Sequence, residues 1–270
     1  AESDATPSIT RISDAKETGF SLATSKTRTG FSKFSAETAL PNLMKAKGWN
    51  LDDICLSFIG FEGETSHAKR QKSLVDKIVS KHGGMGVGKG PGILYDQKKF
   101  DTPYLRDFLL DMGAAGDVSE TATPWSSVVK LHAAAHKAAQ DAYDSLGTKG
   151  WIMSHMSHSY HSGACLYFTF AFTFGDDPMG EYDTVKRAIQ QSFVDNDGTI
   201  SHHHGVGVEH SPWLEEDIST EGVKVMQGLF DSADPGHMFN PGKVTPAKKA
   251  PAAKKAPAAK KAPAKASPKK

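Results

Sequence analysis

The most regular alternation of apolar and polar positions in the chain lies between Ala164 and Phe174. One parity there is large and mostly aromatic: Leu166, Phe168, Phe170, Phe172 and Phe174. The other parity is smaller or more polar: Cys165, Tyr167, Thr169, Ala171 and Thr173. A period of two is typical of a β-strand, because successive side chains point to opposite faces of a sheet. The pattern therefore predicts a strand that buries an aromatic face under helices and turns its other face toward a cavity.

Three further segments are predicted to be extended. Residues 151–160 precede the alternating strand, and the polar break at 161–163 would let the two form a hairpin. Residues 53–63 form an apolar run bounded by polar residues and too short for a helix. The segment that carries His202, His203 and His204 is predicted to be a strand and turn.

Helical spacing separates these strands. One helix is predicted between Thr65 and Gly83, where four apolar residues share a face: Leu74, Val75, Ile78 and Val79. The others are predicted from Thr123-Pro124 to about Gly147, over 181–194, and from Ser211-Pro212 to about Phe230. Strand pairs with intervening helices predict an α+β fold, an antiparallel sheet with helices on one face.

Composition divides the chain into a body and a tail. Residues 245–270 contain nine lysines and no acidic residue, in a Lys/Ala/Pro repeat. The preceding 244 residues hold 23 basic and 31 acidic groups. Such a tail is predicted to be disordered, either without a specific partner or in weak contact with anionic lipid, nucleic acid or an acidic protein. We expect a flexible lead-in over 1–8, one domain over 9–244 and the tail over 245–270.

The apolar runs also bear on the compartment. Cys55 and Cys165 lie in apolar runs and are predicted to be buried thiols without a disulfide. No apolar run reaches the roughly 18 residues of a membrane span, and the N-terminus shows no signal segment. These features predict a reducing, cytoplasmic location, with association at a membrane surface as a further expectation.

Two motifs suggest chemistry that their surroundings do not support. GGMGVGKG (83–90) has the glycine and lysine spacing of a phosphate-binding loop, but Gly90 replaces the Ser or Thr that would bind magnesium. In an extended segment His202 and His204 would face the same way and could share a metal ion, completed by His158 or His210. No cysteine pair or carboxylate has ligand spacing nearby, so we predict no metal. Histidines held only by local hydrogen bonds are the alternative.

Four segments between 157 and 244 carry a family resemblance: SHSYHSGACLYFTFAF, DGTISHHHGVG, HSPWLEEDIS and DPGHMFNPGKV. They resemble the C-terminal half of flavin-dependent oxidases of the vanillyl-alcohol oxidase type. Within that family they are most similar to the alkyldihydroxyacetonephosphate (alkylglycerone-phosphate) synthases. SITRISD, YLRDFLLDMG and ETATPWSSVV also match in order upstream, so the resemblance covers nearly all of 8–244.

The resemblance implies an FAD-dependent exchange of the acyl group of acyl-dihydroxyacetone phosphate for a long-chain alcohol, without net redox change. Tyr160 matches the catalytic tyrosine of the family, which moves the proton next to the ketone. His203 and His204 are implied as catalytic donors to developing negative charge. Arg106 and Arg11 match active-site arginines, whose guanidinium groups suit the phosphate and the leaving carboxylate of the substrate.

The same resemblance implies that FAD contacts His202, His203, His204 and Asn240. The chain departs from the family in two ways. Related 2-hydroxy-acid dehydrogenases have a Gly-Glu-His-Gly turn with a metal-binding glutamate where this chain has three histidines and Gly205. The N-terminal domain that binds most of the FAD is also absent from this sequence. We therefore expect the missing N-terminal FAD-binding half as a partner, a lipid substrate and a homodimer.

Three function classes stay open. The first is the alkyl-exchanging enzyme, or its C-terminal fragment, of ether lipid synthesis. The second is an FAD-dependent 2-hydroxy-acid dehydrogenase or oxidase that uses His204 as its base. The third is a non-catalytic cap fragment that binds no cofactor.

Overall fold

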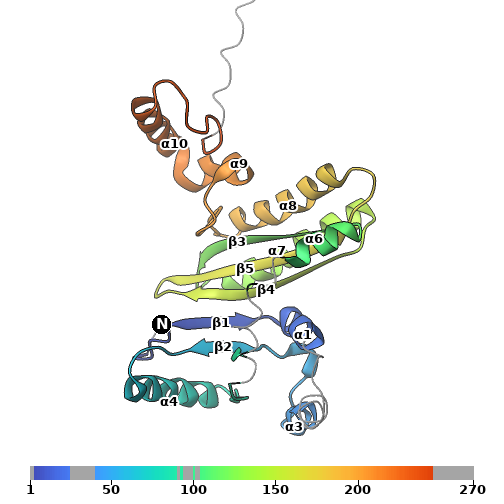
Figure 1. The fold of residues 1–270 in the computed structure, drawn as a ribbon, viewed down its shortest axis with the longest axis vertical. Coiled ribbons are helices and arrows are strands. Elements are labelled where there is room, and N and C mark those ends of the chain that lie inside the picture. The colour runs from blue at the N-terminus through green and yellow to red at the C-terminus, as the bar shows by residue number, and fades with distance from the viewer. Residues whose placement is uncertain (1–2, 25–39, 90–91, 94–99, 101–103, 246–270) are drawn as a thin grey trace, which may run out of the picture.

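The computed structural model describes residues 3–24, 40–89, 92–93, 100 and 104–245 of the chain. These residues form a five-stranded sheet of order β2-β1-β4-β5-β3, and every neighbouring pair is antiparallel (Figure 1). The strands are β1 (Ile9–Ser13), β2 (Ser57–Gly60), β3 (Ala114–Pro124), β4 (Gly150–Ser159) and β5 (Gly163–Thr173). The predicted α+β fold with an antiparallel sheet is confirmed.

Helices precede, separate and follow these strands. They are α1 (Ala15–Thr24), α3 (Leu40–Ala46), α4 (Thr65–Lys81), α6 (Tyr104–Asp111), α7 (Val128–Leu146), α8 (Pro178–Val194), α9 (Gly207–His210) and α10 (Leu214–Ala233), with 3-10 turns at Leu51–Asp53 and Ser211–Trp213. No described helix is long and apolar enough to cross a membrane.

The main core lies between the sheet and helices α7 and α8. Phe168 and Phe170 of β5 are 0% exposed there, as the alternating pattern predicts. Ala135 and Ala139 of α7 are also fully buried, and their small side chains let the helix approach the aromatic face. Burying one Phe side chain contributes about 1.5–3 kcal/mol, so this face anchors the fold. The hairpin of 151–160 with 164–174 is confirmed as β4 and β5.

The predicted helix start at Thr123-Pro124 is wrong. Pro124 is the last residue of β3 and pairs with Gly163, and α7 begins only at Val128. β3 is an edge strand, where proline is tolerated because its missing N–H removes no ladder bond on the outer side. The predicted end is right, because Gly147 forms the left-handed C-cap of α7 with φ of 64°.

Other boundaries differ less. Of the strand predicted over 53–63, only β2 is a strand, and Asn50 caps the 3-10 turn before it. The helix predicted over 181–194 begins at Pro178, after Asp177 accepts a hydrogen bond from Gly180 N (3.1 Å). The last helix is interrupted, since Ser219 in α10 has φ of 70°. Beyond Thr245 the predicted tail lies outside the described residues.

The prediction of two buried thiols is right for Cys165 and wrong for Cys55. Cys165 is 0% exposed on β5, whereas Cys55 is exposed. Cys55 lies in extended chain just before β2, and its neighbours Ile54 and Leu56 take the partly buried positions. In an extended segment an apolar run still alternates between two faces.

Candidate active site

The face of the sheet that turns away from α7 and α8, here called the site face, gathers most of the candidate residues. Glu120 of β3 and Tyr167 of β5 are cross-strand partners on it, and Ala122 pairs with Cys165 beside them. These positions lie toward the end of the sheet where the hairpin joins β4 to β5. Residues more than 40 positions apart in the sequence therefore meet on one surface.

The histidine triplet reaches the site face because the segment before it is fixed to the outer edge of β3. The Thr199 carbonyl accepts from Thr121 Oγ1 (2.7 Å), and the Thr199 amide donates to the Ala122 carbonyl (3.0 Å). Gly198 allows this close approach, since a Cβ there would stand 2.6 Å from Thr121 Oγ1. The residues 201–206 that follow have no regular secondary structure, so the predicted strand at this point is wrong.

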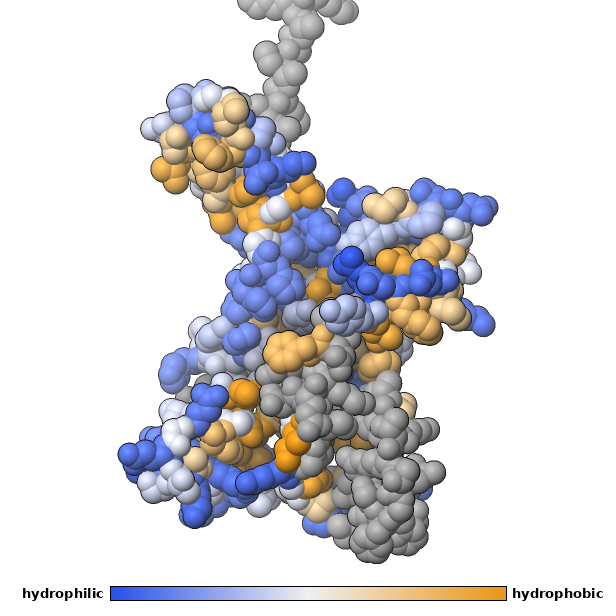
Figure 2. Space-filling view, in the orientation of Figure 1, coloured by the Kyte–Doolittle hydropathy of each residue, from blue (hydrophilic) through white to orange (hydrophobic). Residues whose placement is uncertain are grey.

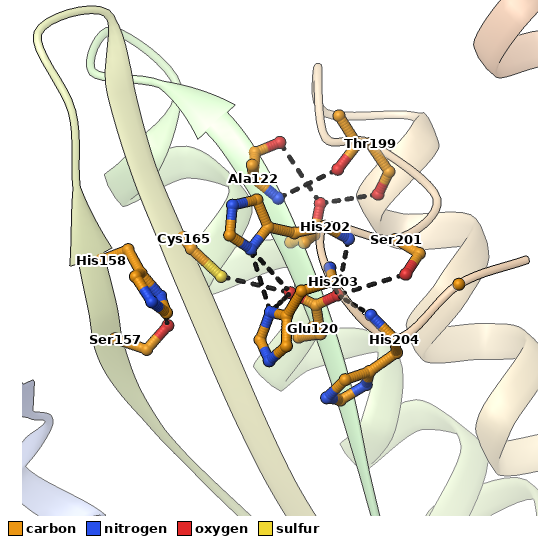
Figure 3. Close-up of polar contacts among 12 residues, drawn as sticks. Glu120, Ala122, Ser157, His158, Cys165, Thr199, Ser201, His202, His203 and His204 are labelled. Atoms are coloured by element: carbon orange, nitrogen blue, oxygen red, sulfur yellow. Dashed lines mark hydrogen bonds and ion pairs between the residues drawn. The ribbon is translucent and has the colours of Figure 1, made fainter.

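Glu120 organises the loop that carries the three histidines (Figure 3). Its Oε1 accepts hydrogen bonds from three successive backbone amides, those of His202 (2.5 Å), His203 (2.7 Å) and His204 (3.3 Å), and from Ser201 Oγ (3.2 Å). Successive N–H groups that converge on one point form an anion-binding nest. Here the carboxylate of the protein itself fills the nest and sets the path of the loop.

The charge on this carboxylate is stable over a wide pH range. Burial alone would raise the pKa of Glu120. The hydrogen bonds from the amides of His203 and His202 and from the Cys165 thiol have the larger combined effect and lower the pKa to about 2. The Nδ1 atoms of His203 and His202 lie 3.2 Å and 3.5 Å from Oε2. A fully buried anion therefore holds two imidazole rings and three amides in place.

The thiol of Cys165 belongs to the same cluster. Its Sγ donates to Glu120 Oε2 (3.2 Å). Burial and the nearby Glu120 carboxylate raise the pKa of Cys165 to about 12. The group is therefore a neutral hydrogen-bond donor and no nucleophile near neutral pH.

Tyr160 meets the histidine loop from the hairpin side. Its hydroxyl lies 2.8 Å from His202 Nε2, and its ring is nearly parallel to that of His158, with 4° between the planes. The backbone is fixed as well, because Trp125 Nε1 donates to the Tyr160 carbonyl (2.9 Å). Tyr160 and His158 also line a cleft of about 350 Å³ between the ends of β4 and β1, whose β1 side is formed by residues 7–10. The cleft thus opens beside the phenol.

A second row of contacts leads from Arg11 to the loop. The Arg11 guanidinium donates to Glu17 Oε1, and Glu17 Oε2 lies 3.0 Å from His155 Nδ1. His155 stacks on Tyr167 with ring centroids 4.9 Å apart, and Tyr167 meets the His204 ring edge-on at 5.5 Å. Burial raises the pKa of Glu17, but His155 and Arg11 lower it more, below its ordinary value. Arg11 therefore faces the same surface as the histidines.

Arg106 and Asn240 are not brought to this cluster. Arg106 is exposed on α6, which packs on β3 through Leu109 against Gly116, four residues before Glu120. Asn240 lies beyond α10 with φ of 44°, and its carbonyl accepts from Lys243 N (3.3 Å). In the part of the chain that the structure describes, no hydrogen bond or ion pair joins either side chain to the histidine loop. Their roles stay predictions.

The histidine pair expected from strand alternation is wrong. The two Nδ1 atoms that approach each other are those of His202 and His203, at 3.0 Å, while His204 turns toward Tyr167. The reason is that the loop is bent, so neighbouring side chains need not point to opposite sides. Together with Glu120 and Cys165 these two rings place four potential ligand atoms within 4.8 Å of one another.

Four residues of the site escaped the sequence analysis: Glu120, Cys165, Glu17 and His155. The signal for Glu120 was present, because ETATPWSSVV is one of the segments that carry the family resemblance. Nothing in the sequence gave its partners, which lie more than 80 positions later. Cys165 was recognised as buried but not as part of the site.

Comparison with known proteins shows the family and the fold of the chain. Residues 1–244 match the family model of FAD linked oxidases, C-terminal domain. The chain is 33% identical over 245 residues to alkyldihydroxyacetonephosphate synthase of Dictyostelium discoideum. The matched region is 90% of this chain and 40% of that protein. The corresponding protein of Trypanosoma brucei brucei is 32% identical over 89% of this chain and 40% of its own length. A solved alkyldihydroxyacetonephosphate synthase superposes with a TM-score of 0.65 at 27% identity, over 86% of this chain and 39% of that chain. The chain thus spans about two fifths of the length of these relatives.

Proposed function

Because the chain belongs to the family of FAD-linked oxidases, through their C-terminal domain, we propose that it forms the substrate side of an alkyldihydroxyacetonephosphate synthase. In the exchange, the bond between the substrate carbon and the acyl oxygen breaks and the fatty acid leaves as a carboxylate. The oxygen of a long-chain alcohol forms the new ether bond, and the hydroxyl proton of the alcohol is released. The reaction needs a group that moves a proton and fixed donors for the negative charge.

The contact between the Tyr160 hydroxyl and His202 Nε2 carries this proposal. A phenol and an imidazole 2.8 Å apart can pass a proton between them. Tyr160 lines the cleft of about 350 Å³, so a proton on the substrate carbon next to the ketone can reach the phenol oxygen. Glu120 fixes the loop of His202 and thereby the position of the acceptor.

Negative charge on the substrate would be met from two directions. The imidazoles of His203 and His204 lie on the loop that Glu120 orders, and each can donate to an oxygen anion. On the other side Glu17 orients the Arg11 guanidinium, whose planar fork suits a phosphate or carboxylate. The donors are positioned before substrate arrives, which is what transition-state stabilisation requires.

The residues present fit the flavin ring of FAD but not its pyrophosphate. Gly205 and Gly207 have φ of 82° and 55°, and the space where their Cβ atoms would be is open apart from their own chain neighbours and nearby helix backbone, which leaves room for a flat ring beside the histidines. The glycine-rich residues 83–89 follow the C-terminal end of α4, where the negative end of the helix dipole repels phosphate. His202, His203 and His204 would hold the ring, and FAD would supply an electron acceptor for the substrate carbon.

The N-terminal FAD-binding half would complete the enzyme. Large apolar side chains are exposed on α6 and α10, among them Phe108 (59%), Val225 (74%) and Leu229 (64%). Figure 2 shows apolar surface on the end of the molecule formed by α10. Exposed apolar groups of this kind are typical of surfaces that another domain covers.

Reconstitution tests the proposal. The chain is combined with the N-terminal half of a relative and FAD, and acyl-dihydroxyacetone phosphate is supplied with a radiolabelled long-chain alcohol. Label is expected in the ether product, with one fatty acid released per alkyl group incorporated. A flavin-loaded complex that releases fatty acid without incorporating the alcohol, or that does neither, contradicts the proposal.

One observation favours a second candidate, a 2-hydroxy-acid dehydrogenase. Glu120 supplies from β3 the carboxylate that the histidine triplet lacks in its own sequence, next to His202 and His203. The cluster has the imidazole and carboxylate donors that a divalent ion prefers. Reduction of an electron-accepting dye by lactate or glycolate in the same complex, in place of alkyl exchange, would support this candidate.

A further inference from the structure

A second group of chemically active side chains lies on the other face of the sheet, under α7. His132 and His136 stand one turn apart on α7, and Asp14 occupies the junction between β1 and α1. Their ligand atoms lie within 4.8 Å of one another. We propose that Asp14, His132 and His136 form a binding site for a divalent transition-metal ion of the zinc class. The proposal is independent of the proposed function.

The distances suit a tetrahedral ion. The Nε2 atoms of His132 and His136 lie 3.3 Å and 3.2 Å from Asp14 Oδ2. Two ligand atoms bound at about 2.0–2.1 Å around a tetrahedral zinc ion are separated by about 3.3 Å, which follows from the tetrahedral angle. Both separations are longer than the most common N–H···O hydrogen bond of about 2.9–3.0 Å. Two of the three separations therefore match a zinc coordination shell, and the third, between the two imidazoles, is within 4.8 Å.

The histidine that lies deeper is poorly satisfied by its surroundings. His136 Nε2 is buried, and beyond its ion-pair contact with Asp14 Oδ2 (3.2 Å) it makes no hydrogen bond within the described residues. A buried imidazole nitrogen that lacks a well-formed hydrogen bond is costly, and a metal ion removes the cost by accepting its lone pair. The side chain of His132 is 37% exposed, so water and an incoming ion can reach the cluster from that side.

Hydrogen bonds fix the orientation of the Asp14 carboxylate, as they do for carboxylates that bind metal ions. Its Oδ1 accepts from Glu17 N (2.7 Å), and its Oδ2 accepts from Ser154 N and Ser154 Oγ, both at 2.9 Å. Hydrogen bonds of this kind orient a ligand before the ion arrives. Two imidazoles and one carboxylate leave the fourth position to water, as in many zinc sites. A bound ion would tie α7 to the junction that leads, through Glu17, to Arg11.

Zinc binding is measured on the chain purified without a histidine tag and dialysed against a chelator. The cluster of Glu120, Cys165, His202 and His203 could also bind the ion, so the measurement starts from the variant H202Q/H203Q. In that background the change H136Q is compared with H67Q, which removes an exposed histidine of α4. Isothermal titration with zinc gives the stoichiometry, and thermal unfolding shows whether the ion stabilises the fold.

In H202Q/H203Q we expect one zinc ion per chain and a higher Tm with zinc. Adding H67Q should leave the binding and the rise in Tm unchanged, and adding H136Q should abolish both. Cobalt in the same background should give a visible spectrum without the thiolate charge-transfer band that a Cys165 ligand would add. Zinc bound equally well after H136Q, or not bound at all in the folded H202Q/H203Q chain, overturns the proposal. If H136Q fails to fold without zinc, H132Q replaces it, because His132 is more exposed and its loss leaves the core intact.

Discussion

Replacing Glu120 by glutamine tests the claim that one buried carboxylate builds the histidine loop. Glutamine keeps the shape and one acceptor oxygen, but it exchanges the other oxygen for an amide donor. That donor would face the thiol of Cys165 and the imidazoles of His202 and His203, which now approach Glu120 Oε2. The variant therefore removes the negative charge, and it places the new amide donor against other hydrogen-bond donors of the cluster.

The magnitude follows from the pKa of Glu120. A shift from 4.5 to about 2 corresponds to roughly 3–4 kcal/mol of stability at pH 7, at about 1.4 kcal/mol per pKa unit. The loss of a partner from a buried charged cluster typically costs about 3–5 kcal/mol, which agrees with that figure. Because the pKa is lowered in the folded state, the contribution is complete above pH 5 and disappears as the pH falls toward 2. Near pH 3 about two fifths of it should remain.

Urea unfolding of the chain and of the E120Q variant at several pH values measures this contribution. We expect E120Q to be less stable by about 3 kcal/mol at pH 7 and the difference to shrink below pH 4. The matched control E62Q changes an exposed carboxylate and should leave the midpoint within about 0.5 kcal/mol of the parent. Equal stability of E120Q and the parent at pH 7, or a difference that does not depend on pH, would refute the reasoning.

Two further predictions concern the surroundings of the loop. At pH 8 iodoacetamide should modify Cys55 and leave the buried Cys165 unmodified in the native chain, which mass spectrometry of peptides can show; equal labelling of both would contradict the assigned burial. G198A should destabilise the chain by more than about 1 kcal/mol in urea unfolding, because its Cβ would stand 2.6 Å from Thr121 Oγ1. The control G228A lies in α10 with no heavy atom within 4 Å and should be neutral or stabilising, by up to about 1 kcal/mol; the reverse order of the two glycine variants would refute the argument.

The fold could be predicted where large apolar side chains mark one face. β5 was found because Phe168 and Phe170 alternate with small groups. Its hairpin partner β4 was found because the polar break at 161–163 separates residues 151–160 from β5. β3 was missed, since AAGDVSETATP has no large apolar side chain apart from Val118. Its register comes from pairing with β5, which acts between residues about 50 positions apart and leaves no local pattern.

The site could be predicted only in part. The histidine triplet and Tyr160 stood out through the family resemblance, and the structure brings His202 and Tyr160 into contact. Glu120 lies in a segment that carries the resemblance, but its role could not be identified from the sequence, because a carboxylate between Ser119 and Thr121 looks like an ordinary polar position. Its role depends on three amides that fold back over β3. The bent loop also defeated the rule of alternating faces, which holds only in extended chain.

The exchange activity of Tyr160→Phe in the reconstituted, flavin-loaded complex tests the central claim most directly. The change removes one oxygen and keeps the ring, so the fold should survive while the contact with His202 Nε2 is lost. Tyr143→Phe is the matched control, since the Tyr143 hydroxyl donates to the Trp151 carbonyl (3.2 Å) from α7, on the face of the sheet opposite the site. Tyr167 is unsuitable as a control because its ring touches His204. The expected result is a fall in exchange of about 100-fold or more for Tyr160→Phe, with flavin content unchanged, and nearly full activity for Tyr143→Phe. Full exchange activity in Tyr160→Phe at equal flavin content would contradict the assignment of this hairpin and the histidine loop as the catalytic site.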